Sequence, residues 1–327
     1  MIGLSTGNDT TLEVSQMTIT EVAQEPQSKE QISEHPLSKI GLLPLAGLLF
    51  LVAVVWRIVD IFVLGLGDTW INIMPSKLFP LLIIAGVFWK YRRTEFSSVL
   101  GLAKGPYFRT QIVLGIGIFA AWHLMLNVFP KIIYGAMDPT YNVSFVILNV
   151  DILWYLFLFF LTNGFLEEVL FRGLLQNTFR ERTSTFGAIF LSGLLFGVWH
   201  VTWPIVNGLD SGFSVGQAIS LVVFSTIFAL FYGYYYENFS SRRTLVGTIT
   251  AHTFMNFINE NFKVGSDPLV QGPDYFYASP ILLGLTIGLF LIAFVVLTFA
   301  AYKYRIEDVQ NQWHRITNWW AGLRVDE

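Results

Sequence analysis

Long apolar runs, separated by short polar segments, fill the chain between residues 39 and 304. A helix that spans a bilayer needs roughly 20 consecutive, predominantly apolar residues. Eight segments come close to this length, at residues 40–65, 71–90, 109–129, 146–170, 185–203, 215–236, 244–261 and 280–302. The pattern therefore predicts an all-α, polytopic membrane helix bundle of about eight transmembrane helices.

The fourth of these segments allows two interpretations. The apolar run from Phe145 onwards is either one long, tilted helix or a short segment followed by a helix centred on Glu167. In both cases we expect Asp151 to cap or begin the span, because an ionised side chain is costly deeper in the bilayer.

The distribution of lysine and arginine between the loops predicts the orientation, because cytoplasmic loops carry an excess of these residues. With the N-terminus inside, the inner side collects Lys90, Arg92, Arg93, Lys104, Arg109, Arg180, Arg182, Arg242, Arg243, Lys303 and Arg305. The outer side keeps only Lys77, Lys131 and Lys263. This asymmetry predicts a multi-pass protein of the cell membrane with both termini cytoplasmic.

The two ends of the chain differ from the transmembrane domain at residues 39–304. Residues 1–38 are polar and predict a disordered tail, and they contain no signal-peptide pattern. Residues 305–327 place apolar side chains at helical spacing, namely Val309, Trp313, Ile316, Trp320 and Leu323. This segment is predicted to be an amphipathic helix on the inner membrane surface, or else a helix packed on a cytoplasmic loop.

Composition supports a membrane protein and excludes some chemistry. The chain is 54% hydrophobic and only 13% charged, whereas a soluble domain is about one quarter charged. The net charge of −3 indicates no nucleic-acid partner. The chain has no cysteine, which excludes disulfides, thiolate metal ligands and a cysteine nucleophile.

Few ionisable residues lie within the predicted spans, and such residues usually face the interior of a bundle. They are Arg57 with Asp60, His123 with Asn127, Asp151, the cluster from Glu167 to Arg172, His200, and His252 with Asn256. We interpret Arg57 and Asp60 as a structural i,i+3 pair. The His123–Asn127 spacing repeats that of His252–Asn256, so this spacing alone is weak evidence of a site.

The stretch FLEEVLFRG carries two adjacent glutamates within an apolar segment. Glu168 and Arg172 are four residues apart, which predicts an ion pair on one helix face. Glu167 points about 100° away from Glu168, and is therefore left to act as a general base. The alternative is a charged cluster that only marks the inner end of the helix.

Two histidines on later segments could complete a site. His200 ends the stretch FGVWH, four residues after Phe196, although a histidine near a helix end more often only makes a hydrogen bond. His252 and Asn256 lie one turn apart and form a donor pair suited to an oxyanion. Hydrogen bonding between helices is an equal alternative for this second pair.

In this order, EEVLFR, FGVWH and HTFMN resemble the EExxxR, FxxxH and HxxxN signature of the CPBP (Abi) family, which includes the type II CAAX prenyl endopeptidases. The resemblance covers about residues 145–260. It implies an intramembrane endopeptidase in which Glu167 activates water together with His200, while His252 and Asn256 stabilise the oxyanion. It implies a supporting role for Glu168, Arg172 and Phe196.

The resemblance leaves the cofactor open. Glu167, His200 and His252 could form a His₂Glu set of zinc ligands. The zincin signature HExxH is absent. We favour a reaction without metal, because a glutamate-activated water needs none and Asn256 suits an oxyanion donor better than a ligand.

The expected partners are the lipid bilayer and a membrane-associated protein or peptide, which is a prenylated CaaX protein for eukaryotic-type members. The alternative is a non-catalytic transporter, immunity protein or scaffold with the same polar cavity, although the internal symmetry of many transporters is absent. Counted from the inner loop boundaries, Glu167, His200 and His252 lie roughly 20, 27 and 14 Å deep at helical rise. A single site therefore requires tilted helices or different boundaries.

Overall fold

The computed structural model describes residues 35–65, 70–105, 107–202, 204–205, 215–266 and 279–320. Residues 36–327 form one compact unit, and the predicted tail at residues 1–38 lies almost wholly outside the described residues. The first half of this unit contains α1 (Pro36–Lys39), α2 (Leu42–Ile58), η1 (Val59–Val63), α3 (Trp70–Tyr91), α4 (Phe96–Val99), α5 (Phe108–His123), η2 (Leu124–Val128) and α6 (Phe129–Met137). The second half contains β1 (Ser144–Ile147), η3 (Val150–Ile152), α7 (Leu153–Glu168), η4 (Val169–Gln176), α8 (Asn177–Arg180), α9 (Thr185–Trp199), α11 (Val215–Tyr234), η5 (Tyr235–Phe239), α12 (Val246–Asn261), β2 (Phe262–Gly265), α13 (Pro280–Lys303) and α14 (Ile306–Trp320).

A helix lies at each of the eight segments predicted from the apolar runs. Within the described residues, five helices are long and apolar enough to cross a membrane, at Leu42–Val63, Phe108–Met137, Val150–Arg180, Ala218–Phe239 and Pro280–Lys303. The helix Thr185–Trp199 is apolar but shorter. The chain is therefore a multi-pass membrane protein built mainly of helices, while the count of eight spans and the cytoplasmic termini stay predictions.

The fourth segment follows the second interpretation, with a short separate piece before the helix. β1 pairs antiparallel with β2, in a register that runs from Ser144 opposite Gly265 to Ile147 opposite Phe262. Asn149 then adopts a left-handed conformation with φ of 56°, and Asp151 lies in the 3₁₀ turn η3 just before α7. Asp151 thus begins the candidate span without capping α7, and the expected all-α fold gains a small sheet.

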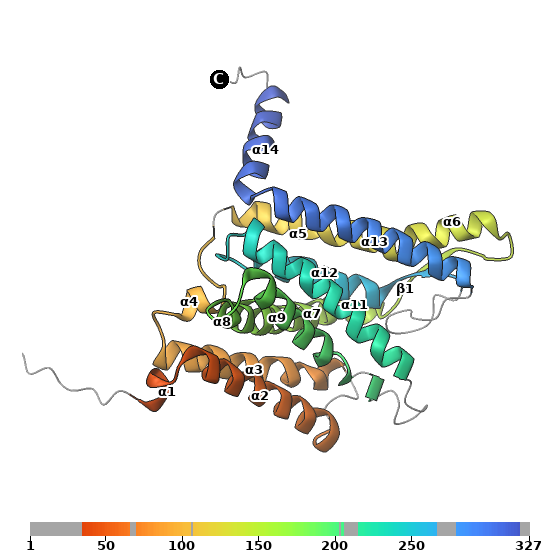
Figure 1. The fold of residues 1–327 in the computed structure, drawn as a ribbon. Helices are drawn as coiled ribbons and strands as arrows, with labels where there is room; N and C mark the ends of the chain where they lie inside the picture. Colours follow the sequence, from red (N-terminus) through yellow and green to blue (C-terminus); the bar gives the residue numbers. More distant parts are fainter. Residues whose placement is uncertain are drawn as a thin grey trace, which may run out of the picture. The chain divides into compact units, whose positions relative to one another are not determined.

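The helices that carry the glutamates and histidines of the sequence motifs lie in the middle of the bundle. Figure 1 shows α2 and α3 on one side, α5 and α13 on the other, and α7, α9 and α12 between them. α12 packs against α5 and α7, and α9 packs against α11. Close approach requires glycine at two places, since a Cβ on Gly164 would lie 2.9 Å from Thr253 Oγ1 and one on Gly197 would lie 2.6 Å from the Val222 carbonyl oxygen.

An apolar core joins α2, α3, η4 and α9 beside these central helices. The ring of Phe171 lies at its centre, with edge contacts to Phe196 at 5.1 Å and to Trp199 at 5.9 Å between centroids. The packing fixes the C-terminal end of α9, where His200 follows directly.

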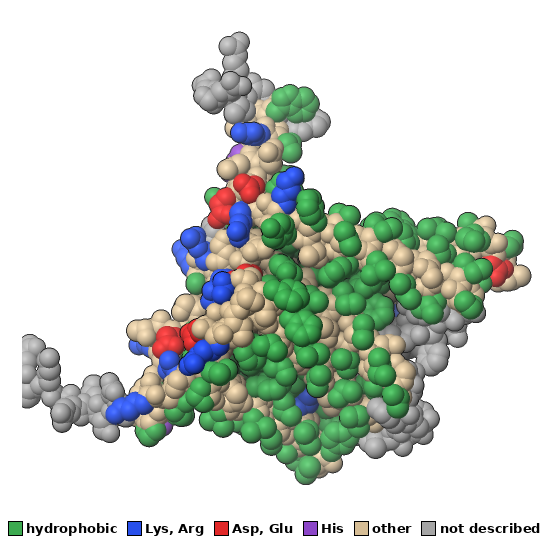
Figure 2. All heavy atoms as spheres, in the orientation of Figure 1, with side chains coloured by type: hydrophobic (Ala, Val, Ile, Leu, Met, Phe, Trp, Pro, Cys, Tyr) green, Lys and Arg blue, Asp and Glu red, His purple; other side chains and the backbone are tan. Residues whose placement is uncertain are grey.

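The surface separates charged from apolar side chains. Figure 2 shows lysine, arginine, aspartate and glutamate side chains gathered at the end of the bundle that carries α1 and α4, with apolar side chains over the flanks. Among the apolar side chains, Leu51, Val113, Trp154 and Val295 are each more than half exposed. Apolar flanks with charge at one end are typical of a helix bundle placed in a bilayer.

The three lysines expected on the outer side are buried, while the side of the membrane on which they lie stays a prediction. Lys77, Lys131 and Lys263 are only 3%, 6% and 8% exposed. Lys131 donates to the Val264 carbonyl and Lys263 to the Asn259 carbonyl, at 2.6 and 2.7 Å. Counting charges between spans cannot show that a long side chain turns inward to reach a partner.

The predicted amphipathic segment forms the helix α14. Ile306 and Val309 pack on the bundle, whereas Trp313, Ile316 and Trp319 are about half exposed or more. The side chain of Trp320 and residue Leu323 lie outside the described residues. Figure 1 shows α14 running across the end of α13 instead of continuing its direction.

Candidate active site

Three helices bring Glu167, His200 and His252 to one point. On α12, His252 Nε2 lies 3.4 Å from Glu167 Oε2 at the end of α7. His200, which follows α9, places its Nε2 4.0 Å from the same oxygen. The sequence motifs therefore form a single cluster.

The place where α12 begins explains why Glu167 and His252 have different depths when residues are counted from the loops. Arg242 Nε donates to Asn177 Oδ1 at 3.1 Å, so these two residues lie at the same level. Asn177 is ten residues after Glu167, and His252 is ten residues after Arg242. The boundary assumed near residue 242 lies closer to the site than the one assumed at residue 180, because the chain there already reaches α8.

The two oxygens of the Glu167 carboxylate have different surroundings. Oε1 accepts a hydrogen bond from the Trp199 indole N–H at 3.2 Å and lies 3.6 Å from the Lys77 ammonium. Oε2 faces the two histidines and has no hydrogen-bond partner among the described residues. Since the side chain is only 3% exposed, this oxygen is available to a group inside the bundle.

The predicted pair between Glu168 and Arg172 is present. Arg172 Nη1 lies 3.1 Å from Glu168 Oε1, and both side chains are almost completely buried. The same oxygen accepts from His252 Nδ1–H at 2.9 Å. A carboxylate bound at Nδ1 fixes the orientation of an imidazole ring and directs Nε2 outward, in this case to Glu167.

The helix is not regular where this pair forms. The segment η4, Val169–Gln176, is π-helical and carries Arg172 beneath Glu168. Single π-helical turns within α-helices often occur at functional sites. The sequence motif predicted the pair but gave no sign of the wider helical turn.

Phe196 lies at the centre of the charged and imidazole groups. The Arg172 guanidinium lies over its ring, 4.3 Å from the centroid, which is a favourable cation–π distance. The same ring lies 4.5 Å from the His200 ring and 5.8 Å from the His252 ring. Tyr232 stacks on the far side of His252, with ring centroids 5.9 Å apart and planes inclined by 20°.

His200 is held in one orientation by its own helix. Its Nδ1–H donates to the Phe196 carbonyl at 2.8 Å, so Nε2 is left as an acceptor that faces Glu167. The His200 side chain is 19% exposed, much more than Glu167 or His252, each of which is 3% exposed. His200 therefore lies at the most accessible side of the cluster.

Asn256 lies one turn after His252 on α12 and is half-buried. It makes no hydrogen bond to another side chain or backbone group of the described residues. Its amide is thus not engaged by another group of the described residues.

The segment at residues 149–258 matches the family described as type II CAAX prenyl endopeptidase, Rce1-like. This segment is an Rce1-like domain. A search of curated proteins found no match. The match confirms the resemblance predicted for about residues 145–260.

The domain contains α7, α9 and α12, and therefore Glu167, His200, His252 and Asn256. Helices α2 and α3 lie outside it. Two residues that contact the site were missed by the sequence analysis, namely Lys77 and Trp199. Lys77 lies inside the predicted span 71–90, where a lone charge is costly, and this cost was the signal that could have identified it.

The other polar residues of the spans separate into two groups. His123 and Asn127 both bind Asn259 Oδ1, at 2.9 and 3.0 Å, and so join α12 away from the Rce1-like motifs. Arg57 reaches the edge of the site instead, since its guanidinium lies 4.5 Å from the Trp199 ring centre and its Nε donates to Thr202 Oγ1 at 3.3 Å.

The reaction without metal stays a prediction for this cluster. The described residues contain no group of three or more histidine, aspartate or glutamate side chains arranged to hold one. The Lys77 ammonium also places a positive charge 3.6 Å from the carboxylate that a divalent cation would need.

Proposed function

We propose that this protein is an intramembrane endopeptidase that hydrolyses a peptide bond of a membrane-associated protein or peptide. The Rce1-like domain supports peptidase activity at the level of the family. The observation that carries the proposal for this chain is the direction of two imidazoles toward one oxygen. His200 Nε2 and His252 Nε2 lie 4.0 and 3.4 Å from Glu167 Oε2, which makes no hydrogen bond of its own among the described residues.

This geometry suits activation of water. A water molecule can donate one hydrogen bond to Glu167 Oε2 and one to His200 Nε2, because two acceptors 4.0 Å apart are both within reach of one oxygen. As the water oxygen bonds to the peptide carbonyl carbon, Glu167 takes the proton. When the carbon–nitrogen bond breaks, Glu167 passes this proton to the leaving amine.

His252 and Asn256 would lie on the opposite side of the reacting carbon, next to the carbonyl oxygen. The negative charge that develops on the carbonyl oxygen needs donors in fixed positions. The Asn256 amide has two N–H groups and makes no hydrogen bond among the described residues. His252 is held in position by Glu168 and lies one turn before Asn256 on α12.

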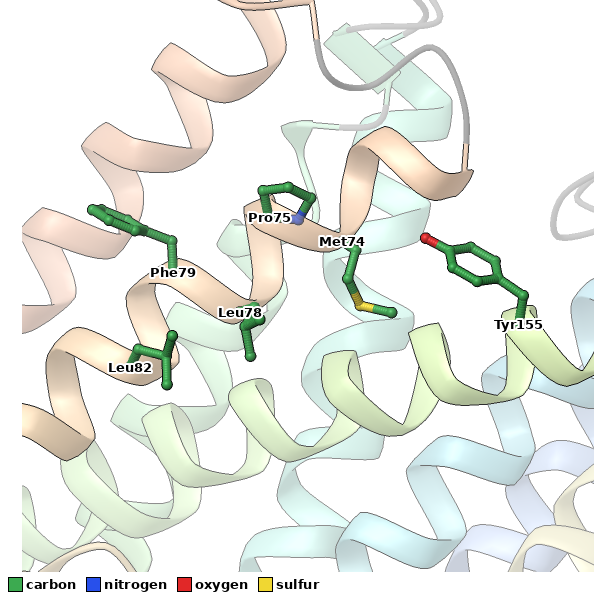
Figure 3. Close-up of a pocket in the computed structure, with 6 residues that line it drawn as sticks. All are labelled: Met74, Pro75, Leu78, Phe79, Leu82 and Tyr155. Carbon is green, nitrogen blue, oxygen red and sulfur yellow. The ribbon is translucent and has the colours of Figure 1, made fainter.

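The surroundings favour a substrate with a hydrocarbon portion. A surface groove of about 420 Å³ lies between α3 and α7, the helices that bear Lys77 and Glu167, and Figure 3 shows side chains that line it. It is lined by Met74, Pro75, Leu78, Phe79, Leu82 and Tyr155. The match to the type II CAAX prenyl endopeptidase family makes a prenylated CaaX-type peptide the first substrate to try.

The test compares wild type with Glu167→Gln in the native cell lacking its own copy. Glutamine keeps the size of the side chain but cannot accept the proton. Protein termini are then compared in the membrane and secreted fractions. A small set of termini formed only by wild type would support the protease and identify its substrates. Identical termini, with Glu167→Gln restoring any phenotype, would instead support a non-catalytic membrane protein.

A further inference from the structure

Lys77 contributes to this site from outside the Rce1-like domain. It lies in the apolar helix α3, and its side chain is 4% exposed. A buried ammonium is strongly unfavourable unless a countercharge accompanies it. Its Nζ lies 3.6 Å from Glu167 Oε1, and no other oxygen of the Rce1-like motifs has an ion pair with a lysine in the described part of the chain.

We infer that Lys77 is a positioning residue for Glu167, an inference that rests on the proposed function. The plane of a carboxylate can turn about its C–C bond unless its oxygens are bound. Here the Lys77 ammonium and the Trp199 indole N–H both lie at Oε1, at 3.6 and 3.2 Å. Turning the plane out of this orientation would remove both contacts, so the second oxygen stays directed at His200 and His252, where the proton must be taken up.

Arg57 on α2 supports the same side of the carboxylate. Its guanidinium stacks on the Trp199 ring at 4.5 Å while its Nε binds Thr202 Oγ1, so it holds the indole that donates to Glu167. The Rce1-like domain thus supplies the groups that face Oε2, and also Trp199. Helices α2 and α3 supply the cations on the side of Oε1.

A purely structural role for Lys77 makes a different prediction. If the pair only joined α3 to α7, its loss would lower the stability of the protein. Cleavage would then fall in proportion to the amount of folded protein, and cleavage per folded molecule would not change. If Lys77 positions the base, cleavage per folded molecule falls and a cation at the same place restores it. Catalytic geometry is sensitive at this level, since a misplacement of about 1 Å can cost about 100-fold in rate.

The experiment uses the full chain in the native cell, with wild type, Glu167→Gln, Lys77→Met, Lys77→Arg and Lys131→Met. Lys131 is the matched control, because it is a buried lysine that binds the Val264 carbonyl instead of the site. The rate at which the termini specific to wild type form is divided by the amount of folded protein. We expect a loss of about 10- to 100-fold for Lys77→Met, recovery for Lys77→Arg, and no loss for Lys131→Met.

A second measurement needs no substrate. Lys77→Met is introduced into the wild type and into Glu167→Gln, and the unfolding midpoints of the purified proteins are compared. Direct pairing predicts that Lys77→Met lowers the midpoint clearly in the wild type and much less in Glu167→Gln. Equal shifts would overturn the pairing, and so the inference. Wild-type cleavage by Lys77→Met, or an equal loss in Lys131→Met, would overturn it as well, whereas absence of cleavage by wild type would count against the proposed function alone.

Discussion

His252 Nδ1 lies 2.9 Å from Glu168 Oε1, while the opposite nitrogen of the same ring faces Glu167. One imidazole therefore connects two adjacent carboxylates that have different partners. Glu168 is neutralised by Arg172 and orients the ring, and Glu167 keeps one oxygen open. The division predicted from the i,i+4 spacing is thus present, with the addition that the second glutamate acts on the site through His252.

Glu168→Gln is expected to lower both stability and cleavage. Loss of its charge leaves the Arg172 guanidinium buried without a partner, which costs about 3–5 kcal/mol. The double variant Glu168→Gln/Arg172→Met should regain much of the stability, because it buries no lone charge. It should not regain cleavage, because a neutral amide holds the Nδ1–H of His252 less strongly than a carboxylate does. Thermal unfolding and the formation of termini are measured on both variants. If stability and cleavage both returned in the double variant, this assignment would be contradicted.

His200→Ala is expected to abolish cleavage without unfolding the protein. The side chain is 19% exposed and makes one hydrogen bond to its own helix, so little packing is lost. Loss of one partner for the water should reduce the rate by about 10²- to 10⁴-fold. His123→Ala is the control, because this histidine binds Asn259 away from Glu167. Equal activity of the two variants would remove His200 from the reaction.

Asn256→Ala tests the oxyanion donor. We expect a loss of about 10²- to 10³-fold in rate, with an unchanged unfolding midpoint, because the amide makes no hydrogen bond among the described residues. Asn127→Ala should show the reverse pattern, since it breaks a 3.0 Å bond to Asn259 but lies apart from the motifs. Steady-state rates and melting curves for the two variants decide the matter, and full activity of Asn256→Ala would defeat the proposed role.

Removal of metal ions is expected to leave cleavage unchanged. The reaction proposed here uses Glu167 and His200 to activate water, and Lys77 holds the positive charge next to the carboxylate. Purified protein should contain no stoichiometric zinc, and a chelator should not slow the reaction. Stoichiometric zinc whose removal abolishes cleavage would instead support Glu167, His200 and His252 as ligands.

Helix α14 is expected to lie in the membrane interface. Its tryptophans Trp313 and Trp319 are 61% and 71% exposed, and indole rings favour this depth. The chain has no cysteine, so a single spin label can be placed at Ile316→Cys on the apolar side or at Asn311→Cys on the opposite face as the control. In vesicles, the label at 316 should be accessible to oxygen and that at 311 to a water-soluble relaxation agent. Equal exposure of both labels to water would favour packing on a loop.

The sequence predicted what depends on local spacing. Apolar runs identified the helices, and the spacing of four residues identified the pair of Glu168 with Arg172. The family resemblance brought in His200, His252 and Asn256, and the structure places the two histidines beside Glu167. The roles of these residues in catalysis stay predictions.

What could not be predicted depends on contacts between distant segments. Lys77 was counted as an outer charge because its partner lies ninety residues later, on a helix that spacing rules do not connect to α3. The two short strands were not predicted, because SFVI also continues an apolar helical run. Only its pairing with Phe262–Gly265 stabilises it as a strand. Neither the Lys77 contact nor this strand pairing can be read from the local sequence pattern.

The π-helical stretch η4 changes how this helix responds to a change in chain length. Hydrogen bonds from residue i to i+5 accommodate more residues in a turn than those of an α-helix. Deleting one residue after Arg172 would remove this excess and let the backbone wind regularly, so that Asn177 and the residues beyond it would keep roughly their present direction. A deletion in the regular helix α7 would instead turn everything beyond it by about 100°. The π-helical stretch is therefore the place where this helix should best tolerate the loss of a single residue.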